Sequence, residues 1–159
     1  IFTLKDQESI EAIEVEHNKS PEMRILQKAL AEDITLRIHG EEALEMAHKA
    51  SNILFGKSTA EDLKSISEDD FLSIFSGVPQ SEISMNELKE GLGIIDALSA
   101  KSGFLKSNGE ARRALKENSI SVNKTKVNDQ YTLGETDLLS QRYVLLQRGK
   151  KSYCILKFA

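Results

Sequence analysis

Apolar residues in the first third of the chain recur at helical spacing. Ser20-Pro21 places a capping serine before a proline at the first helical position. Apolar residues then follow at intervals of three and four, and Gly40 supplies a C-terminal stop. A short amphipathic stretch precedes this helix at 6–16, and a further helix is predicted over 43–54.

Two capping patterns continue the helical part. Ser58-x-x-Glu61 and Ser67-x-x-Asp70 each predict the start of a short helix. Gly77-Val78-Pro79-Gln80 then breaks the periodicity. We therefore predict an all-helical bundle over residues 1–80, followed by a linker near 77–90.

The pattern changes in the last third of the chain. Residues 92–102 and 107–117 predict two short helices, and from Ile120 the apolar period becomes two. The predicted strands are 120–123, 126–127, 143–148 and 152–158. Two helices with a small antiparallel sheet make an α+β domain over residues 91–159, so we expect an α+β protein.

Charge divides the chain in the same way. Residues 1–91 hold nine basic and nineteen acidic residues (net −10), whereas residues 92–159 hold twelve basic and six acidic ones (net +6). A basic module fused to an acidic one indicates a polyanionic partner, although ordinary surface charge gives the same numbers. Because no apolar run approaches the roughly 20 residues of a membrane span and Cys154 is the single cysteine, we expect a cytoplasmic protein without membrane contact.

Motifs for catalysis or metal binding are absent from the sequence. The three histidines have no metal-ligand spacing, and no cysteine pair exists. The chain also lacks the P-loop, the dinucleotide fingerprint and the nucleophile elbow. We expect neither a catalytic residue nor a metal site. Because the chain starts Ile1-Phe2-Thr3 rather than with methionine, we expect it to be part of a longer protein.

The predicted helix over 107–117 is the most informative segment. Its apolar residues fall at i, i+3 and i+4, so Arg112, Arg113 and Lys116 project from the other side. Lys106 and the free amides at the helix start add donors suited to phosphate, and arginine binds phosphate oxygens in a bidentate way. This arrangement suits an RNA backbone. The alternative is a solvated basic face on which Arg113 pairs with Glu117.

The same segment resembles a known RNA-binding domain. Residues 107–115 read S-x-x-E-A-R-R-x-L and residues 120–127 read I-x-V-N-x-x-K-V. This pattern resembles the domain first described in ribosomal small-subunit protein S-four, where E-A-R-R-L-I precedes V-x-V-N-G-x-x-V. The chain departs from the family at Ala114, and it has Ser119 and Lys124 where glycine is usual. Asn123 in the turn tolerates the left-handed conformation.

Further matches span nearly the whole chain. Residues 39–47 (H-G-E-E-A-L-E-x-A), residues 50–56 (A-S-x-x-L-F-G) and residues 146–153 (L-Q-R-G-K-K-x-Y) look like the C-terminal part of bacterial tyrosyl-tRNA synthetases. Phe2-Thr3-Leu4 and the acidic helix after it do so as well. The order of the matches is that of the family.

The resemblance implies how the chain would bind RNA. Residues 1–80 would form a helical anticodon-binding domain and residues 91–159 an S-four-like RNA-binding domain, which together grip the anticodon arm and the long variable arm of tRNA-Tyr. The candidate RNA-binding residues are Lys106, Ser107, Asn108, Arg112, Arg113, Lys116, Asn123, Lys124, Arg148, Lys150 and Lys151.

The resemblance also implies a parent enzyme, a tyrosine-tRNA ligase of class I. Its upstream domain would activate tyrosine with ATP and Mg²⁺ and charge the tRNA. Both signatures of that domain, of the H-I-G-H and K-M-S-K-S types, are absent here, so we expect no aminoacylation and no cofactor in this chain. Since the family's dimer contacts come mainly from the upstream domain, we expect a homodimeric parent and a monomeric fragment.

Two other interpretations come from different classes of protein. A stand-alone S-four-type RNA-binding protein, acting on ribosomal RNA or in RNA modification, would need a different front domain, and the matches at 39–56 argue against it. An adaptor that binds proteins through the acidic helices would leave the basic helix unexplained.

Overall fold

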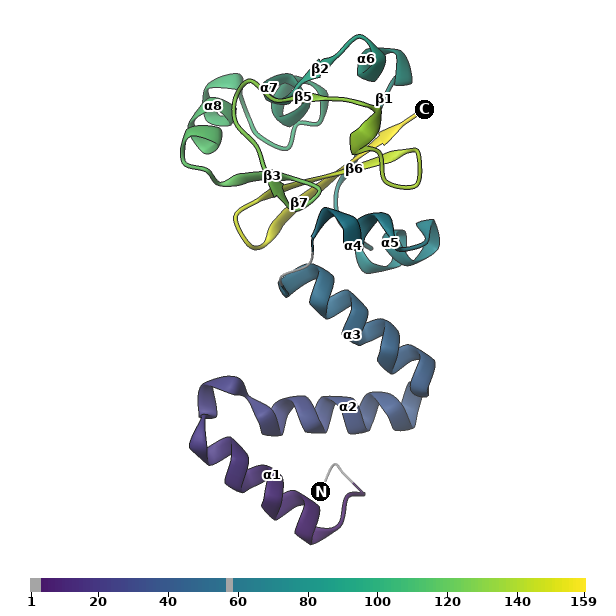
Figure 1. Ribbon diagram of the computed structural model, residues 1–159, viewed down its shortest axis with the longest axis vertical. Helices are drawn as coiled ribbons and strands as arrows, with labels where there is room; N and C mark the ends of the chain where they lie inside the picture. The colour runs from purple at the N-terminus through teal and green to yellow at the C-terminus, as the bar shows by residue number, and fades with distance from the viewer. Residues whose placement is uncertain (1–3, 57–58) are drawn as a thin grey trace. The chain divides into compact units, whose positions relative to one another are not determined.

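The computed structural model describes residues 4–56 and 59–159, and the chain separates into two compact units. The first unit is Ile1–Asn52 and the second is Ile53–Ala159. Figure 1 shows the helices of the first unit and the sheet of the second. The α+β class predicted from the sequence is confirmed.

Helices make up the described part of the first unit. They are α1 (Gln7–Lys19), the 3₁₀ turn η1 (Pro21–Met23), α2 (Ile25–His39) and α3 (Glu41–Phe55), whose last residues belong to the second unit. The Asp6 side chain caps α1 by accepting a 2.7 Å hydrogen bond from the Ser9 amide. Gly40, with φ 86°, ends α2 as predicted.

The second predicted helix begins later than Pro21. Arg24 takes a left-handed conformation (φ 56°) and separates the 3₁₀ turn from α2. None of residues 4–52 is buried, and Leu36 and Ile38 of α2 are 45 % and 68 % exposed. The described residues of this unit therefore form a helical layer without a closed core. This differs from the helical bundle that the sequence periodicity predicts.

A five-stranded sheet organises the second unit. Its strands are β1 (Gln80–Ile83), β3 (Ile120–Val122), β4 (Thr125–Lys126), β6 (Tyr143–Arg148) and β7 (Ser152–Phe158), in the order β1-β7-β6-β3-β4. The four strands from β7 to β4 pair antiparallel as predicted, and β1 adds a parallel edge next to β7. A separate antiparallel pair joins β2 (Leu92–Gly93) to β5 (Thr132–Leu133).

Short helices cover this sheet. They are α4 (Ala60–Lys64), α5 (Glu68–Ile74), α6 (Met85–Lys89), α7 (Ile94–Asp96), the π-helix η2 (Ala97–Lys101), α8 (Asn108–Lys116) and the 3₁₀ turn η3 (Glu135–Asp137). Ser67 caps α5 and Ser107 caps α8, as predicted. The capping box of α4 is formed by Thr59 and Asp62, whereas the predicted cap Ser58 lies outside the described residues.

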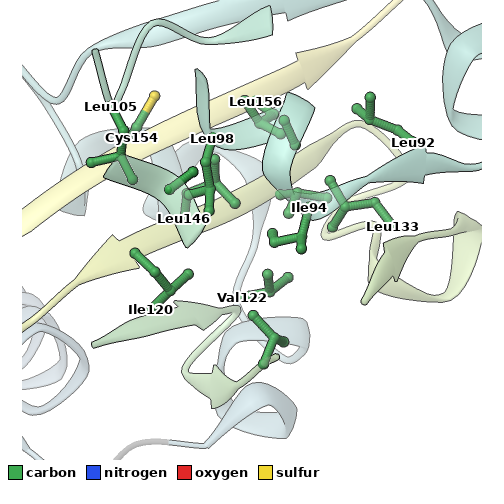
Figure 2. Packing of buried hydrophobic residues seen from close by; sticks show 14 of the residues in the cluster. Leu92, Ile94, Leu98, Leu105, Ile120, Val122, Leu133, Leu146, Cys154 and Leu156 are labelled. Atoms are coloured by element: carbon green, nitrogen blue, oxygen red, sulfur yellow. The ribbon is translucent and has the colours of Figure 1, made fainter. Parts of the chain in front are cut away.

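Both faces of the sheet are apolar. Successive strand residues point to opposite faces, so Val144 and Leu146 of β6 meet one core while Tyr143 and Leu145 meet the other. The first core contains Ile94, Leu98 and other residues from the helices on its side, as Figure 2 shows. The second core contains Leu63, Phe71 and Phe75 from α4 and α5. The second unit is therefore a three-layer arrangement with helices on both sides of the sheet (Figure 1).

This packing corrects the predicted division of the chain. Helices α4 and α5 fall within the predicted helical domain 1–80, but they pack on the sheet, because β6 and β7 present a second apolar face that must be covered. The predicted linker at 77–90 contains β1, whose backbone pairs with β7, and helix α6. The division lies between Asn52 and Ile53, and not between residues 80 and 91.

The predicted turns are confirmed. The hairpin of β6 and β7 has the predicted strand bounds and turns at Gly149, which has φ 60°. Asn123 (φ 45°) and Lys124 (φ 70°) form a two-residue turn between β3 and β4. Left-handed conformations at both positions define the type I′ turn that matches strand twist, so the turn stays tight although Lys124 replaces the usual glycine.

Candidate nucleic-acid interface

Helix α8 presents a cationic face because its apolar side is fixed in the core. Ala111, Ala114 and Leu115 are buried, and Arg112, Arg113 and Lys116 are exposed. Within the part of the chain that the structure describes, these three cations form no ion pair. The alternative pairing of Arg113 with Glu117 is not formed. We call Arg112, Arg113 and Lys116, together with exposed Lys106, the α8 face.

The start of α8 is tied to the tip of the β6–β7 hairpin. The Ser107 hydroxyl accepts a 3.2 Å hydrogen bond from the Glu110 amide. The Glu110 carboxylate accepts from Arg148 Nη1 at 2.6 Å and from the Lys106 amide at 3.0 Å. These hydrogen bonds, with that from Arg148 the stronger, hold the pKa of Glu110 below its ordinary value. Arg148 thus fixes the hairpin against the helix and is only partly available to a ligand.

A groove of about 770 Å³ lies beside the end of α8. Its lining residues come from the end of α3, the segment after α8, the strands β3, β4 and β6, and the hairpin tip. They are Leu54, Phe55, Gly56, Glu117, Asn118, Ser119, Ser121, Lys124, Lys126, Gln147, Gly149, Lys150 and Lys151. The lining includes four lysines and a single carboxylate, that of Glu117. We call this groove the lysine groove.

Lys124 is held at the floor of the groove by Tyr153. Its Nζ donates a 3.3 Å hydrogen bond to the Tyr153 hydroxyl and lies 5.0 Å from the centre of that ring. Burial lowers the pKa of Lys124. The Tyr153 hydroxyl in turn donates to the Leu54 carbonyl oxygen at 2.9 Å. Tyr153 therefore ties the last turn of α3 to the sheet and fixes one wall of the groove.

The sequence of the second unit matches one protein family. Residues 70–156 fit the model of the tyrosine–tRNA ligase SYY-like C-terminal domain. The chain belongs to this family. Its α8 face and most of the lysine groove lie within the matched residues, whereas Leu54, Phe55 and Gly56 precede them.

Individual relatives extend the similarity over nearly the whole chain. The tyrosine–tRNA ligase of Flavobacterium johnsoniae is 54 % identical over 99 % of this chain and 36 % of its own length. That of Cytophaga hutchinsonii is 48 % identical over 99 % of this chain and 38 % of its own length. The solution structure of a tyrosyl-tRNA synthetase C-terminal domain aligns with a TM-score of 0.49 and 21 % identity, covering 61 % of this chain and 94 % of that one. The chain thus spans little more than a third of the curated relatives that it matches.

The structure places the predicted RNA-binding residues in two cationic groups, and gives structural roles to the others. Lys106, Arg112, Arg113 and Lys116 form the α8 face, and Lys124, Lys150 and Lys151 line the lysine groove. Ser107 is occupied as the helix cap, and Asn108 accepts a hydrogen bond from the Ser99 hydroxyl.

Asn123 requires a correction. Its side chain is 3 % exposed, accepts from the Leu145 amide at 2.9 Å and donates to the Asp137 carbonyl at 2.6 Å. A buried amide with both ends bonded is not available to RNA, so the role of Asn123 is to hold the turn that presents Lys124.

Sequence reasoning missed two groove residues, Lys126 and Phe55. Lys126 had a usable signal, because it lies two residues after the candidate Lys124 in the basic part of the chain. Phe55 had none, since a phenylalanine at the end of a helix is usually expected to be buried. Its side chain is 74 % exposed.

Neither a metal-binding group of side chains nor a membrane-spanning helix is found among the described residues. They include no group of three His, Cys, Asp or Glu side chains placed to hold an ion. No helix among them has the length and apolar character needed to cross a membrane.

Proposed function

We propose that this chain is the tRNA-binding part of a tyrosine-tRNA ligase and that it binds tRNA-Tyr. The observation that carries the proposal is the α8 face, on which Arg112, Arg113 and Lys116 form no ion pair with any described residue. This face belongs to a domain of a family named for tyrosine–tRNA ligase. The relatives that match the chain bear the name of an enzyme that acts on tRNA. A polyanion with regularly spaced phosphates suits such a face.

The physical role of the α8 face is to bind phosphate oxygens. Arg112 and Lys116 lie one turn apart on α8 and point away from its buried side. Contacts of this kind fix the position of a protein on RNA without reading its sequence. Discrimination between tRNAs then falls to the hairpin tip with Lys150 and Lys151, which can reach an unpaired base, and to the shape of the long variable arm.

The activity of the whole protein is part of the same proposal. A further domain would activate tyrosine with ATP and Mg²⁺ and transfer it to the tRNA held by this chain. We expect that domain to make the homodimer contacts, so that this chain by itself is monomeric and inactive. The first unit would reach the anticodon arm and the second unit the long variable arm. A cytoplasmic location goes with this role in translation.

Filter binding with three RNAs tests the proposal. The chain is titrated against tRNA-Tyr, a tRNA with a short variable arm, and a fragment of ribosomal RNA, at one fixed salt concentration. We expect the highest affinity for tRNA-Tyr. Equal affinity for all three RNAs, or a preference for ribosomal RNA, would contradict the proposal and favour a stand-alone RNA-binding protein.

A further inference from the structure

Phe55 is an exposed aromatic side chain in a cationic groove. A single exposed apolar residue needs no explanation by itself, but Phe55 lines the lysine groove together with Lys126, Lys150 and Lys151. With 74 % of its surface open to solvent, it offers an accessible ring face. An aromatic ring flanked by cations is the arrangement that binds unpaired nucleotides, whose bases stack while their phosphates are neutralised.

Phe55 is also held in position. Its neighbour Ile53 is 4 % exposed and packs in the second core, and the Leu54 carbonyl oxygen accepts a hydrogen bond from Tyr153. The Tyr153 ring packs edge-on against Phe75 with 5.7 Å between the ring centres. The backbone on the N-terminal side of Phe55 is therefore anchored at two points, which reduces the entropy lost when a base stacks on the ring.

The remaining lining suits the edges of a nucleobase. Asn118 and Gln147 are among the lining residues. Gln147 Nε2 already donates to the Gly149 carbonyl oxygen at 2.8 Å and to the Tyr153 hydroxyl at 3.3 Å. The exposed Asn118 has a side-chain amide, which can both donate and accept hydrogen bonds. The groove volume of about 770 Å³ lies within the range of about 300–1,000 Å³ that is usual for small-ligand sites. A base inside a duplex cannot reach the ring, because its faces are covered by neighbouring base pairs.

We propose that the lysine groove binds an unpaired nucleotide of the RNA, with its base stacked on Phe55 and its phosphates among Lys126, Lys150 and Lys151. This inference rests on the proposed function and deepens it. The α8 face then contacts the backbone of paired RNA, and the lysine groove captures a nucleotide from a loop, bulge or end. Two neighbouring cationic surfaces would thus recognise two different states of one RNA.

Three substitutions of Phe55 in the full chain test the stacking. Phe55→Ala removes the ring, Phe55→Leu keeps apolar bulk without it, and Phe55→Trp enlarges it. We expect Phe55→Ala and Phe55→Leu to weaken tRNA-Tyr binding by about tenfold, as is typical when a stacking residue is removed, and Phe55→Trp to preserve it. Ser73→Ala is a control in the same unit, since Ser73 is exposed on α5 and does not line the groove.

Fluorescence gives a second and direct readout. The chain has no tryptophan, so Phe55→Trp introduces a single reporter in the groove. We expect its emission to be quenched by tRNA-Tyr and by a single-stranded oligonucleotide, but not by a blunt RNA duplex. Quenching by the duplex to the same extent would overturn the stacking of an unpaired base.

The outcomes separate this inference from the proposed function. If the unsubstituted chain prefers tRNA-Tyr and the Phe55→Ala variant binds this tRNA with unchanged affinity, the inference is wrong and the proposed function stands. If the unsubstituted chain does not prefer tRNA-Tyr over ribosomal RNA, the proposed function fails, and the inference fails with it. Circular dichroism of each variant shows that the fold is retained.

Discussion

At the scale of single residues, Asn123 joins three segments of the second unit. Its amide bonds the backbone of Leu145 in β6 and of Asp137 in η3, and its own φ of 45° shapes the turn after β3. These contacts indicate that Asn123 stabilises the fold. The neighbouring residue, Lys124, carries the charge that the turn delivers to the groove.

Replacing Asn123 with alanine should therefore destabilise the fold. We expect Asn123→Ala to lower the free energy of unfolding by about 2–5 kcal/mol, because the buried Leu145 amide and the half-buried Asp137 carbonyl lose their partner and alanine strains a left-handed position. Urea denaturation followed by circular dichroism measures this loss. Asn86→Ala, at an exposed position of α6, is the control and should change stability by less than about 0.5 kcal/mol. A similar small change for Asn123→Ala would show that these bonds contribute nothing.

Individual site residues differed in how far sequence could predict them. Ser107 and Arg112 followed from a capping motif and a helical period, both of which are local properties. The burial of Asn123 and the exposure of Phe55 depend on where β6 and the end of α3 lie in the folded unit. No spacing rule along the chain contains that information.

At the scale of elements, α5 fixes the second apolar face of the sheet. Phe71 is 1 % exposed and packs 4.9 Å from the ring centre of Phe75 and 5.6 Å from that of Tyr143 in β6. The Tyr143 hydroxyl donates to the Glu68 carboxylate at 2.8 Å, and this bond raises the pKa of Tyr143. The helix and the strand are thus joined by packing and by a hydrogen bond.

We expect Phe71→Ala to destabilise the sheet unit by about 3–5 kcal/mol, the usual loss for a buried phenylalanine. Ser73→Ala, at an exposed position of the same helix, should leave stability nearly unchanged. Thermal unfolding, followed by the circular dichroism signal of the β-sheet, compares the two variants. If Phe71→Ala unfolds like the parent chain, α5 is not part of the sheet core.

The elements themselves were largely predictable, and their partners were not. Ser67 and Ser107 marked helix starts, and Gly149 marked the hairpin, because caps and turns are encoded by neighbouring residues. Periodicity shows that α5 buries one face but not against which element. Strand β1 escaped prediction because its four residues include a single buried one, Ile83, so its alternation is too short to detect.

At the scale of the whole molecule, the division after Asn52 decides which fragments fold. A chain of residues 53–159 keeps both cores of the sheet, whereas a chain of residues 91–159 loses α4, α5, α6 and β1. We expect the first to unfold cooperatively in urea and the second to show no cooperative transition, since Tyr143, Leu145 and Ile155 would be exposed. Cooperative unfolding of residues 91–159 would restore the boundary predicted from the sequence.

The salt dependence of tRNA-Tyr binding tests the central claim most directly. Affinity is measured by filter binding at several salt concentrations for the parent chain, for the Arg112→Ala, Lys116→Ala double variant, and for a Lys89→Ala, Arg142→Ala control that loses the same charge at other exposed positions. Each phosphate contact contributes about 0.7–0.9 to the slope of log affinity against log salt. We expect the double variant to bind tRNA-Tyr roughly tenfold or more weakly, and its slope to fall by the amount that about two phosphate contacts contribute. The control variant should have the affinity and the slope of the unsubstituted chain. A double variant that binds tRNA-Tyr like the parent at every salt concentration would show that α8 is not the RNA-binding face.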